Sequence, residues 1–239
     1  MTFNHAYERI LRLMGYPPAT WGGSVSQQEE VSDVMGYWTR IAWEEAPWSD
    51  RLRYAERTIV EDADGISTLP LKVSGSPTLG GVFGVFDVDP RTKYTANRLA
   101  YRPGATALYL GIAETSSGTL WVQYRDPAPQ FTRVAYNGAT TYAEGAVVYD
   151  STSGECYVSA DDANTGNAVT DTAWWTVQEV PAYLWEVITR GAFSELLRND
   201  GRGDRADVEE ARAMAELDRA VLAQESQQGQ EPEIRFKVT

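Results

Sequence analysis

The sequence predicts an α+β protein: a helical bundle host with a small antiparallel β region, and a small all-β module inserted into that host. Apolar residues recur with a helical period before residue 47 and after residue 180, and with a period of two between about residues 57 and 125. From residue 136 to residue 178, short apolar runs alternate with turn-forming residues, which is typical of β-hairpins. We therefore expect a host domain made of residues 1–135 and 179–239, and an inserted aromatic β module made of residues 136–178.

Two helices are expected at the start of the chain. The first begins after Thr2, a candidate N-cap, and ends at Gly15. Its apolar positions share one face: Phe3, Tyr7, Ile10, Leu11 and Met14. The second begins at Ser26, because Ser26 and Glu29 have the spacing of a capping box, in which each side chain binds a backbone N–H. Its apolar stripe ends before Pro47 and consists of Val31, Val34, Met35, Trp38, Ile41 and Ala42.

The middle of the host is expected to be a small antiparallel β region. Four short segments have strand patterns: residues 57–61, 81–87, 107–112 and 120–125. In the last segment Leu120, Val122 and Tyr124 alternate with Trp121, Gln123 and Arg125, so the two sets are expected on opposite faces of a strand. Turn-forming clusters separate the segments.

After the module the pattern returns to helix, over residues 184–197 and 205–227, with a break at residues 199–203. Two antiparallel helices are the simplest interpretation, and Glu209 and Glu216 are spaced to pair with the arginines three residues later. At the C-terminus, alternating apolar residues predict a lone strand that needs an edge elsewhere in the fold or on a neighbour. Its candidate assembly contacts are Ile234, Phe236 and Val238.

Composition excludes several classes of function. A formal net charge of -13 and a pI of about 4.6 disfavour broad attraction to phosphate backbones or anionic membranes. Cys156 is the only cysteine and His5 the only histidine, so we expect no disulfide, no metal site, no cofactor and no catalytic residue. Without an apolar leader or a membrane-length apolar stretch, we expect a soluble, non-enzymatic protein made in the cytoplasm.

The aromatic residues of the module have two interpretations. Because a domain of this size has few ways to exclude water, they can form its core. Alternatively, exposed aromatic rings can stack on sugar rings and form a glycan-binding face. The candidate residues for either role are Tyr142, Tyr157, Trp174 and Trp175. Trp174 and Trp175 are expected to split between the two faces, since neighbours on a strand point in opposite directions.

Aromatic residues and glycines of the module follow a characteristic run: Tyr136-Asn137-Gly138, Tyr142, Gly145, Val147-Val148-Tyr149, Gly154, Tyr157 and Trp174-Trp175. By this run the module resembles the short chitin-binding-type modules of chitinases, which also occur as additions to phage structural proteins. In this chain a tyrosine, Tyr136, stands at the first aromatic position, where a tryptophan is common. The resemblance implies a carbohydrate-binding-like fold for this part of the chain.

The elements of the host follow a particular order: N-terminal helices with Trp43 and Trp48, the run 81–90, the run 120–125 leading to residues 129–132, a late helical pair and a C-terminal strand. In this order the host resembles the head-to-tail connector, or adaptor, proteins of tailed bacteriophages. It implies a ring, commonly of twelve copies, that docks under the portal protein, contacts downstream tail or neck proteins and lets genomic DNA pass without catalysis or sequence-specific binding. It also implies a place in the virion neck.

The competing class is a carbohydrate-binding or host-attachment protein, in which the module binds and the host is a scaffold. The connector interpretation is favoured because an acidic chain with an unpaired terminal strand suits a subunit that its partners complete, and because an acidic channel wall lets DNA slide.

Overall fold

The computed structural model describes residues 1–17, 24–46, 48–62, 64–73, 79, 81–93, 96–111 and 118–227. The fold is mixed α+β, with four α-helices and three antiparallel sheets in these residues. The chain divides into two compact units: unit 1 comprises Met1–Ala46 and Ala128–Thr239, and unit 2 comprises Pro47–Pro127. The β region of the predicted host is thus a compact unit of its own, whereas residues 136–178 belong with the helices.

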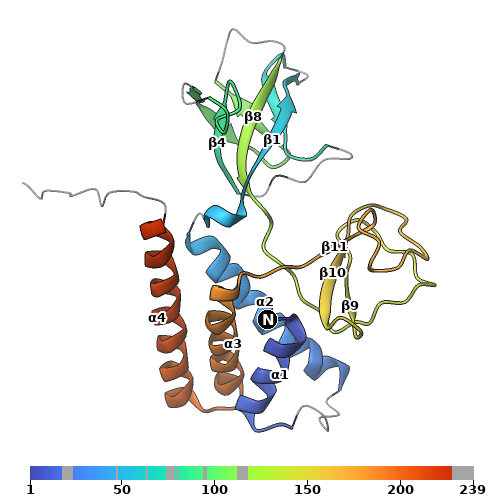
Figure 1. The fold of residues 1–239 in the computed structure, drawn as a ribbon, viewed down its shortest axis with the longest axis vertical. Helices are drawn as coiled ribbons and strands as arrows, with labels where there is room; N and C mark the ends of the chain where they lie inside the picture. The colour runs from blue at the N-terminus through green and yellow to red at the C-terminus, as the bar shows by residue number, and fades with distance from the viewer. Residues whose placement is uncertain are drawn as a thin grey trace, which may run out of the picture. The chain divides into compact units, whose positions relative to one another are not determined.

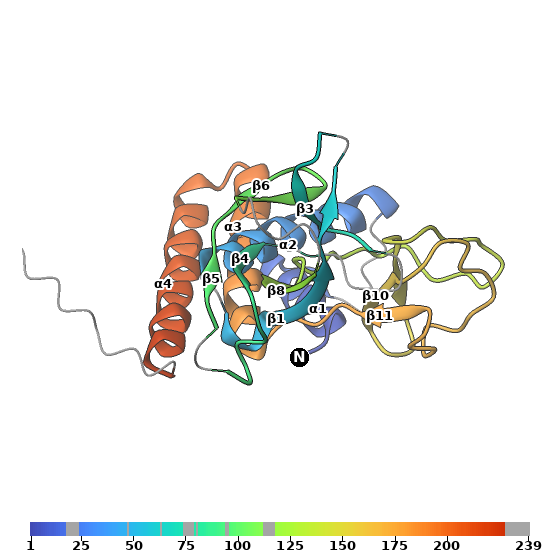
Figure 2. The ribbon, with the colours of Figure 1, turned by 90° about the horizontal axis from the view of Figure 1, so that it is seen from above.

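Unit 1 is built around one central helix. Its helices are α1 (Phe3–Met14), α2 (Val25–Glu45), α3 (Trp185–Asn199) and α4 (Gly203–Gln227), with a short 3-10 turn at Ala182–Leu184 before α3. Helix α3 packs against each of the other three, and it lies beside α4 along its length (Figure 1). The view from above also shows α3 and α4 side by side (Figure 2). None of the helices in the described part of the chain combines the length and the apolar character needed to cross a bilayer.

Helix α1 confirms its prediction. The Thr2 hydroxyl accepts a hydrogen bond from the backbone N–H of His5, and Gly15 ends the helix with a φ of 87°. Four of the five predicted apolar residues are buried, and Met14 packs against the core between α3 and α4.

Helix α2 begins two residues earlier than predicted. Its N-cap is Ser24, which forms the capping box with Gln27, so the prediction for Ser26 and Glu29 is wrong. Both pairs have the same spacing, and the earlier start leaves the Glu29 carboxylate free to accept from Thr132 and Arg133 instead. The predicted stripe is largely confirmed, with Val31, Met35, Trp38 and Ala42 buried, while Pro47 lies outside the described residues.

A glycine allows α2 and α3 to approach closely. Gly191 is buried in the middle of α3, and a Cβ added there would overlap the indole ring of Trp38 on α2. Trp38 is itself buried, so the ring has no open space into which it could move. This contact therefore sets the spacing between the two helices.

Unit 2 consists of two four-stranded antiparallel sheets that share a core. One sheet has the order β1-β8-β4-β5, and its strands are β1 (Leu52–Thr58), β8 (Thr119–Arg125), β4 (Val82–Phe86) and β5 (Arg98–Leu99). The other has the order β2-β3-β7-β6, and its strands are β2 (Val60–Glu61), β3 (Ser67–Pro70), β7 (Ala107–Leu110) and β6 (Tyr101–Pro103). A 3-10 turn at Ser49–Arg51 precedes β1.

The two sheets are joined at both edges. A single residue, Ile59, separates β1 from β2, and Ala100 separates β5 from β6, so each edge strand of one sheet runs on into an edge strand of the other. This arrangement leaves few unpaired edges. The shared core comprises Ile59, Leu69, Leu79, Val85, Leu108, Leu110, Leu120, Val122 and Tyr124, so one of the two alternating sets of β8 faces this core.

The module region forms the third sheet, of three antiparallel strands in the order β11-β10-β9. The strands are β9 (Val147–Asp150), β10 (Glu155–Ser159) and β11 (Trp175–Val177). Isolated bridges join Ala135 to Tyr149 and Tyr142 to Asn164, so much of the region is held by turns and side chains instead of long ladders.

Two glycines inside helices of unit 1, Gly191 and Gly36, give a matched test of the contact between α2 and α3. Gly191→Ala should destabilise the protein by about 1–3 kcal/mol, because the new methyl group overpacks against Trp38. Gly36→Ala, where a Cβ meets nothing within 4 Å, should stabilise by about 0.5–1 kcal/mol through helix propensity. Chemical denaturation followed by far-ultraviolet circular dichroism measures both, and equal effects would show that the close approach does not limit packing.

Candidate functional site

The predicted site residues gather around one buried tryptophan. Trp175 is 2% exposed and forms the module core with Val148 and Val169. Tyr142, Tyr157 and Trp174 are half-buried and pack against this core, as does Tyr136. The structure therefore brings all four candidates together, with Trp175 inside the core and Trp174 at its margin.

Two tyrosine rings enclose Trp175. Tyr136 and Tyr142 lie edge-on to its indole, at centroid distances of 5.7 and 5.2 Å, and they stack on each other at 6.1 Å. The indole Nε1 and the Tyr136 hydroxyl both donate to the carbonyl of Asn167, at 3.0 and 2.8 Å. The Tyr142 hydroxyl accepts from the N–H of Asn137 and donates to its carbonyl. Because these polar groups are satisfied within the module, the three rings act as structural anchors.

A second cluster joins the module to helix α1. The guanidinium of Arg133 lies over the rings of Tyr7 and Tyr149, at 4.6 and 4.1 Å from their centroids. Arg133 Nη1 donates to Asn4 Oδ1 at 2.9 Å, and the Tyr149 hydroxyl donates to the same oxygen at 3.1 Å. We call Asn4, Tyr7, Arg133 and Tyr149 the arginine joint. It connects α1, the segment that enters the module, and strand β9.

The N-terminus of α1 also depends on the module. The first N–H groups of a helix have no partner within the helix. Here the N–H of Phe3 donates to the carboxylate of Glu155 at 3.0 Å, and that of Asn4 donates to the carbonyl of Gly154 at 2.9 Å. Phe3 itself is buried between the rings of Phe131 and Tyr149. Residues far apart in the chain thus complete the start of this helix.

Burial shifts the acid–base behaviour of the groups at this contact. It raises the pKa of the Cys156 thiol to about 12, and the thiol donates to the carbonyl of Thr132. It raises the pKa of Tyr7 to about 12 and that of Glu155 above its ordinary value, although the Phe3 N–H opposes the shift at Glu155. A thiol that stays protonated at neutral pH is a poor nucleophile, so the chemistry here is that of a packed contact.

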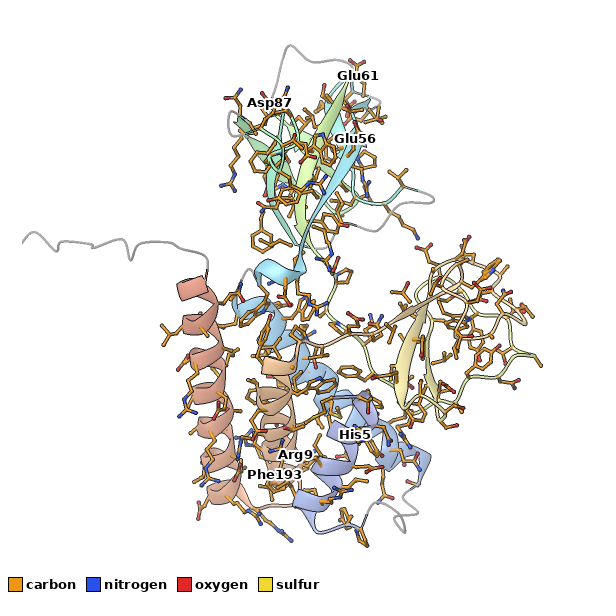
Figure 3. The ribbon with its side chains drawn as sticks, in the orientation of Figure 1. His5, Arg9, Glu56, Glu61, Asp87 and Phe193 are labelled. Atoms are coloured by element: carbon orange, nitrogen blue, oxygen red, sulfur yellow. The ribbon has the colours of Figure 1, made fainter. Side chains whose placement is uncertain are left out.

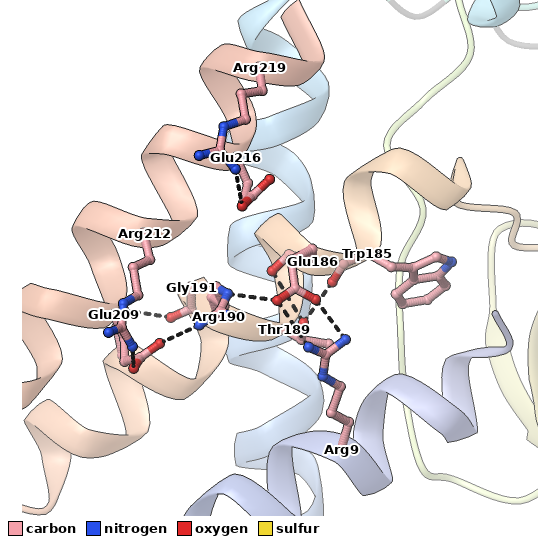
Figure 4. Close-up of polar contacts among 11 residues, drawn as sticks. Arg9, Trp185, Glu186, Thr189, Arg190, Gly191, Glu209, Arg212, Glu216 and Arg219 are labelled. Carbon is pink, nitrogen blue, oxygen red and sulfur yellow. Dashed lines mark hydrogen bonds and ion pairs between the residues drawn. The ribbon is translucent and has the colours of Figure 1, made fainter.

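A chain of ion pairs joins α1, α3 and α4 (Figure 4). Arg9 binds both carboxylate oxygens of Glu186, and Arg190 bridges Glu186 and Glu209 at 2.6 and 2.9 Å. Glu209 also accepts from Arg212, and Glu216 from Arg219, which confirms the predicted pairs on α4. Each of these groups is held by an opposite charge, so this network stabilises the helix arrangement.

The single histidine, two acidic residues of unit 2 and the candidate assembly contacts are not part of these clusters. His5 lies on the exposed side of α1, whereas Glu56 and Asp87 belong to unit 2 (Figure 3). Ile234, Phe236 and Val238, with the strand that they were predicted to form, lie outside the described residues. Within the described ranges, no group of three or more His, Cys, Asp or Glu side chains is placed to hold a metal ion.

Sequence patterns did not reveal the arginine joint. One signal was present: the segment from residue 136 to residue 178 contains no Lys or Arg, and Arg133 is the only basic residue between Arg125 and Arg190. An isolated arginine at the entry to a wholly acidic segment marks a position with a specific partner.

A scan against protein-family models found no match to this chain, and neither did a search of the curated proteins.

Two glycines of the module test its contact with α1. Gly154 and Gly145 both adopt a positive φ, 73° and 82°, so alanine costs similar backbone strain at either, about 1–2 kcal/mol. Only at Gly154 would the new Cβ press on α1, 3.0 Å from Asn4 Cβ. We expect Gly154→Ala to destabilise more than Gly145→Ala and to speed amide hydrogen exchange at residues 3–5. Equal exchange in both variants would contradict a module fixed to α1.

The paired tryptophans test the role of the module. Trp175→Ala should cost about 3–5 kcal/mol, because it empties the core. Trp174→Ala should cost less, about 1–2 kcal/mol, since the side chain is only half-buried. Denaturation curves measure both costs, and retention on a chitin column measures glycan binding. If Trp174→Ala removes measurable retention of the wild-type protein, the module is a binding face and not only a structural one.

Proposed function

We propose that this protein is a non-enzymatic virion structural protein: a ring-forming head-to-tail adaptor of a tailed bacteriophage. Its helices serve as a helical bundle host that docks under the portal and links the capsid to downstream tail or neck proteins. Genomic DNA passes through the ring. The protein is made in the host cytoplasm and resides in the virion neck.

The observation that carries the proposal is the outer surface of α4. This helix of 25 residues buries Ala206, Ala213 and Leu217 against the rest of unit 1. Its opposite face leaves Val208 and Leu222 50% and 64% exposed. Apolar side chains aligned on one exposed helix face favour contact with another protein surface, which assembly from identical subunits supplies.

Charge distribution supports the same proposal. Residues 47–127, which form unit 2, contain nine acidic and nine basic residues, so the formal net charge of -13 belongs entirely to unit 1. An acidic surface repels the phosphate backbone, and DNA would slide past it without sticking. The order of elements, with two helices before the β unit and the paired helices α3 and α4 after the module, is the order on which the resemblance rests.

A second candidate function is glycan binding by the module, acting in host attachment. The observation that favours it is the partial exposure of Trp174 and Tyr157, whose rings pack against the module core without being fully covered. The rings of Tyr136, Tyr142 and Trp175 are engaged with one another. A glycan would therefore stack on Trp174 or Tyr157.

Portal binding tests the adaptor function. The purified full chain should co-sediment with the portal protein encoded in the same genome, and electron microscopy of the complex should show a ring continuous with the portal channel. The portal of an unrelated phage is the matched control and should leave the protein in the supernatant. The adaptor function is contradicted if the cognate portal does not bind and mass spectrometry does not find the protein in purified virions.

A further inference from the structure

The outer surface of α4 carries three parallel ridges, each with a seven-residue spacing. Residues seven apart lie nearly above one another on a helix, with a drift of about 20° per step. The apolar ridge is Val208, Ala215 and Leu222. On one side of it runs a basic ridge, Arg205, Arg212 and Arg219, and on the other an acidic ridge, Asp204, Ala211 and Asp218. All nine residues are exposed.

The basic ridge remains able to bind a partner. Arg212 and Arg219 each make one intrahelical ion pair, but their side chains are 58% and 72% exposed. Arg205 lies over the ring of Phe193 on α3. Since a guanidinium has five N–H donors, a single ion pair leaves most of them available. The surface is thus an apolar seam with opposite charges on its two sides.

We propose that this surface binds α4 of a second copy of the chain, with the two helices parallel and in register. In a parallel pair the basic ridge of each helix faces the acidic ridge of the other, as at the charged flanks of a coiled coil. In an antiparallel pair the basic ridges would face each other, and like charges would repel. Such a pair is related by a two-fold axis parallel to the helices, so the contact joins two copies and does not by itself continue around a ring; the proposal therefore does not depend on the adaptor function.

The contact is expected to be weak in isolation. A helix of 25 residues is about 37 Å long, and one helix-to-helix contact buries less than the roughly 1,200 Å² of a standard stable interface. Alanine and aspartate at central positions reduce the apolar area further. A covalent trap is therefore a better assay than a measurement of stable dimers.

Cross-linking between introduced thiols tests both the contact and its direction. Positions 208 and 222 are fourteen residues apart, about 21 Å along the helix, which exceeds the reach of a short bismaleimide. Val208→Cys alone and Leu222→Cys alone should each form cross-linked dimers if the helices are parallel. If they are antiparallel, only a mixture of the two variants should cross-link. Cys156 is buried and stays protonated, so the wild-type protein should not react.

Random collisions between protein molecules produce some cross-linked dimers even without a specific contact. Arg12→Cys, on the exposed face of α1, carries a thiol of similar accessibility and measures that background. Both single variants on α4 should exceed it clearly. Yields no higher than those of Arg12→Cys, or cross-links formed only in the mixture, would overturn the proposal.

Charge exchange then tests the pairing of the ridges. In the Leu222→Cys background, Arg205→Glu with Arg219→Glu should reduce cross-linking to background, because two acidic ridges then meet. Asp204→Arg with Asp218→Arg should do the same, because two basic ridges meet. The four changes together should restore cross-linking, which also shows that α4 remains folded. Failure of the combined variant to recover, with a normal circular dichroism spectrum, would contradict charge pairing.

The two proposals fail in different ways. If the protein cross-links at position 222 but does not bind the cognate portal, the α4 contact is supported and the adaptor function is contradicted. If the protein binds the portal as a ring but both single variants show only background cross-linking, the adaptor function is supported and the α4 contact is contradicted.

Discussion

The helical part of this protein depends on the absence of one side chain. At Gly191 the backbone of α3 approaches the buried indole of Trp38, and any Cβ would push α2 and α3 apart. Helix α3 is the common neighbour of α1, α2 and α4, so its position relative to α2 also decides where Glu186 and Arg190 lie. From α3, Glu186 pairs with Arg9 on α1 and Arg190 pairs with Glu209 on α4. Close packing on one side of α3 and ion pairs on its other sides thus act together in ordering these helices.

The module and helix α1 depend on each other for their structure. Two of the otherwise unpaired N–H groups of α1 bind Gly154 and Glu155, which lie some 150 residues later in the chain. Arg133 adds a contact with rings on both sides. Removing residues 137–177 would therefore uncover Phe3 and leave the start of α1 unsatisfied, so the module does more than decorate the surface. Contacts between residues so far apart in the chain carry a loop-closure cost, which slows folding.

Local sequence patterns were sufficient to predict the long helices and strands. They were not sufficient to predict features that depend on contacts between residues far apart in the chain. The helical period located α1, α3 and α4, and the alternation of residues 120–125 located β8. The predicted start of α2 was wrong because Ser24 with Gln27 and Ser26 with Glu29 both have the spacing of a capping box. In the structure the Glu29 carboxylate accepts hydrogen bonds from Thr132 and Arg133, a tertiary contact that local spacing does not show. Strands β5 and β6, of two and three residues, are too short to show a period. The arginine joint unites residues 4, 133 and 149, which no local spacing relates.

Charge segregation connects the fold to the proposed assembly. Because the whole formal charge of -13 lies on unit 1, copies of this unit repel one another at long range, and the repulsion is screened only beyond about 10 Å in ordinary salt. Any surface that brings two such units together must offset this repulsion locally, with opposite charges placed at contact distance and an apolar seam between them. On α4 the basic and acidic ridges on either side of the apolar one meet that requirement only when neighbouring helices run in the same direction. A weak local attraction working against a long-range repulsion favours a contact that forms only when the two units are already held close together.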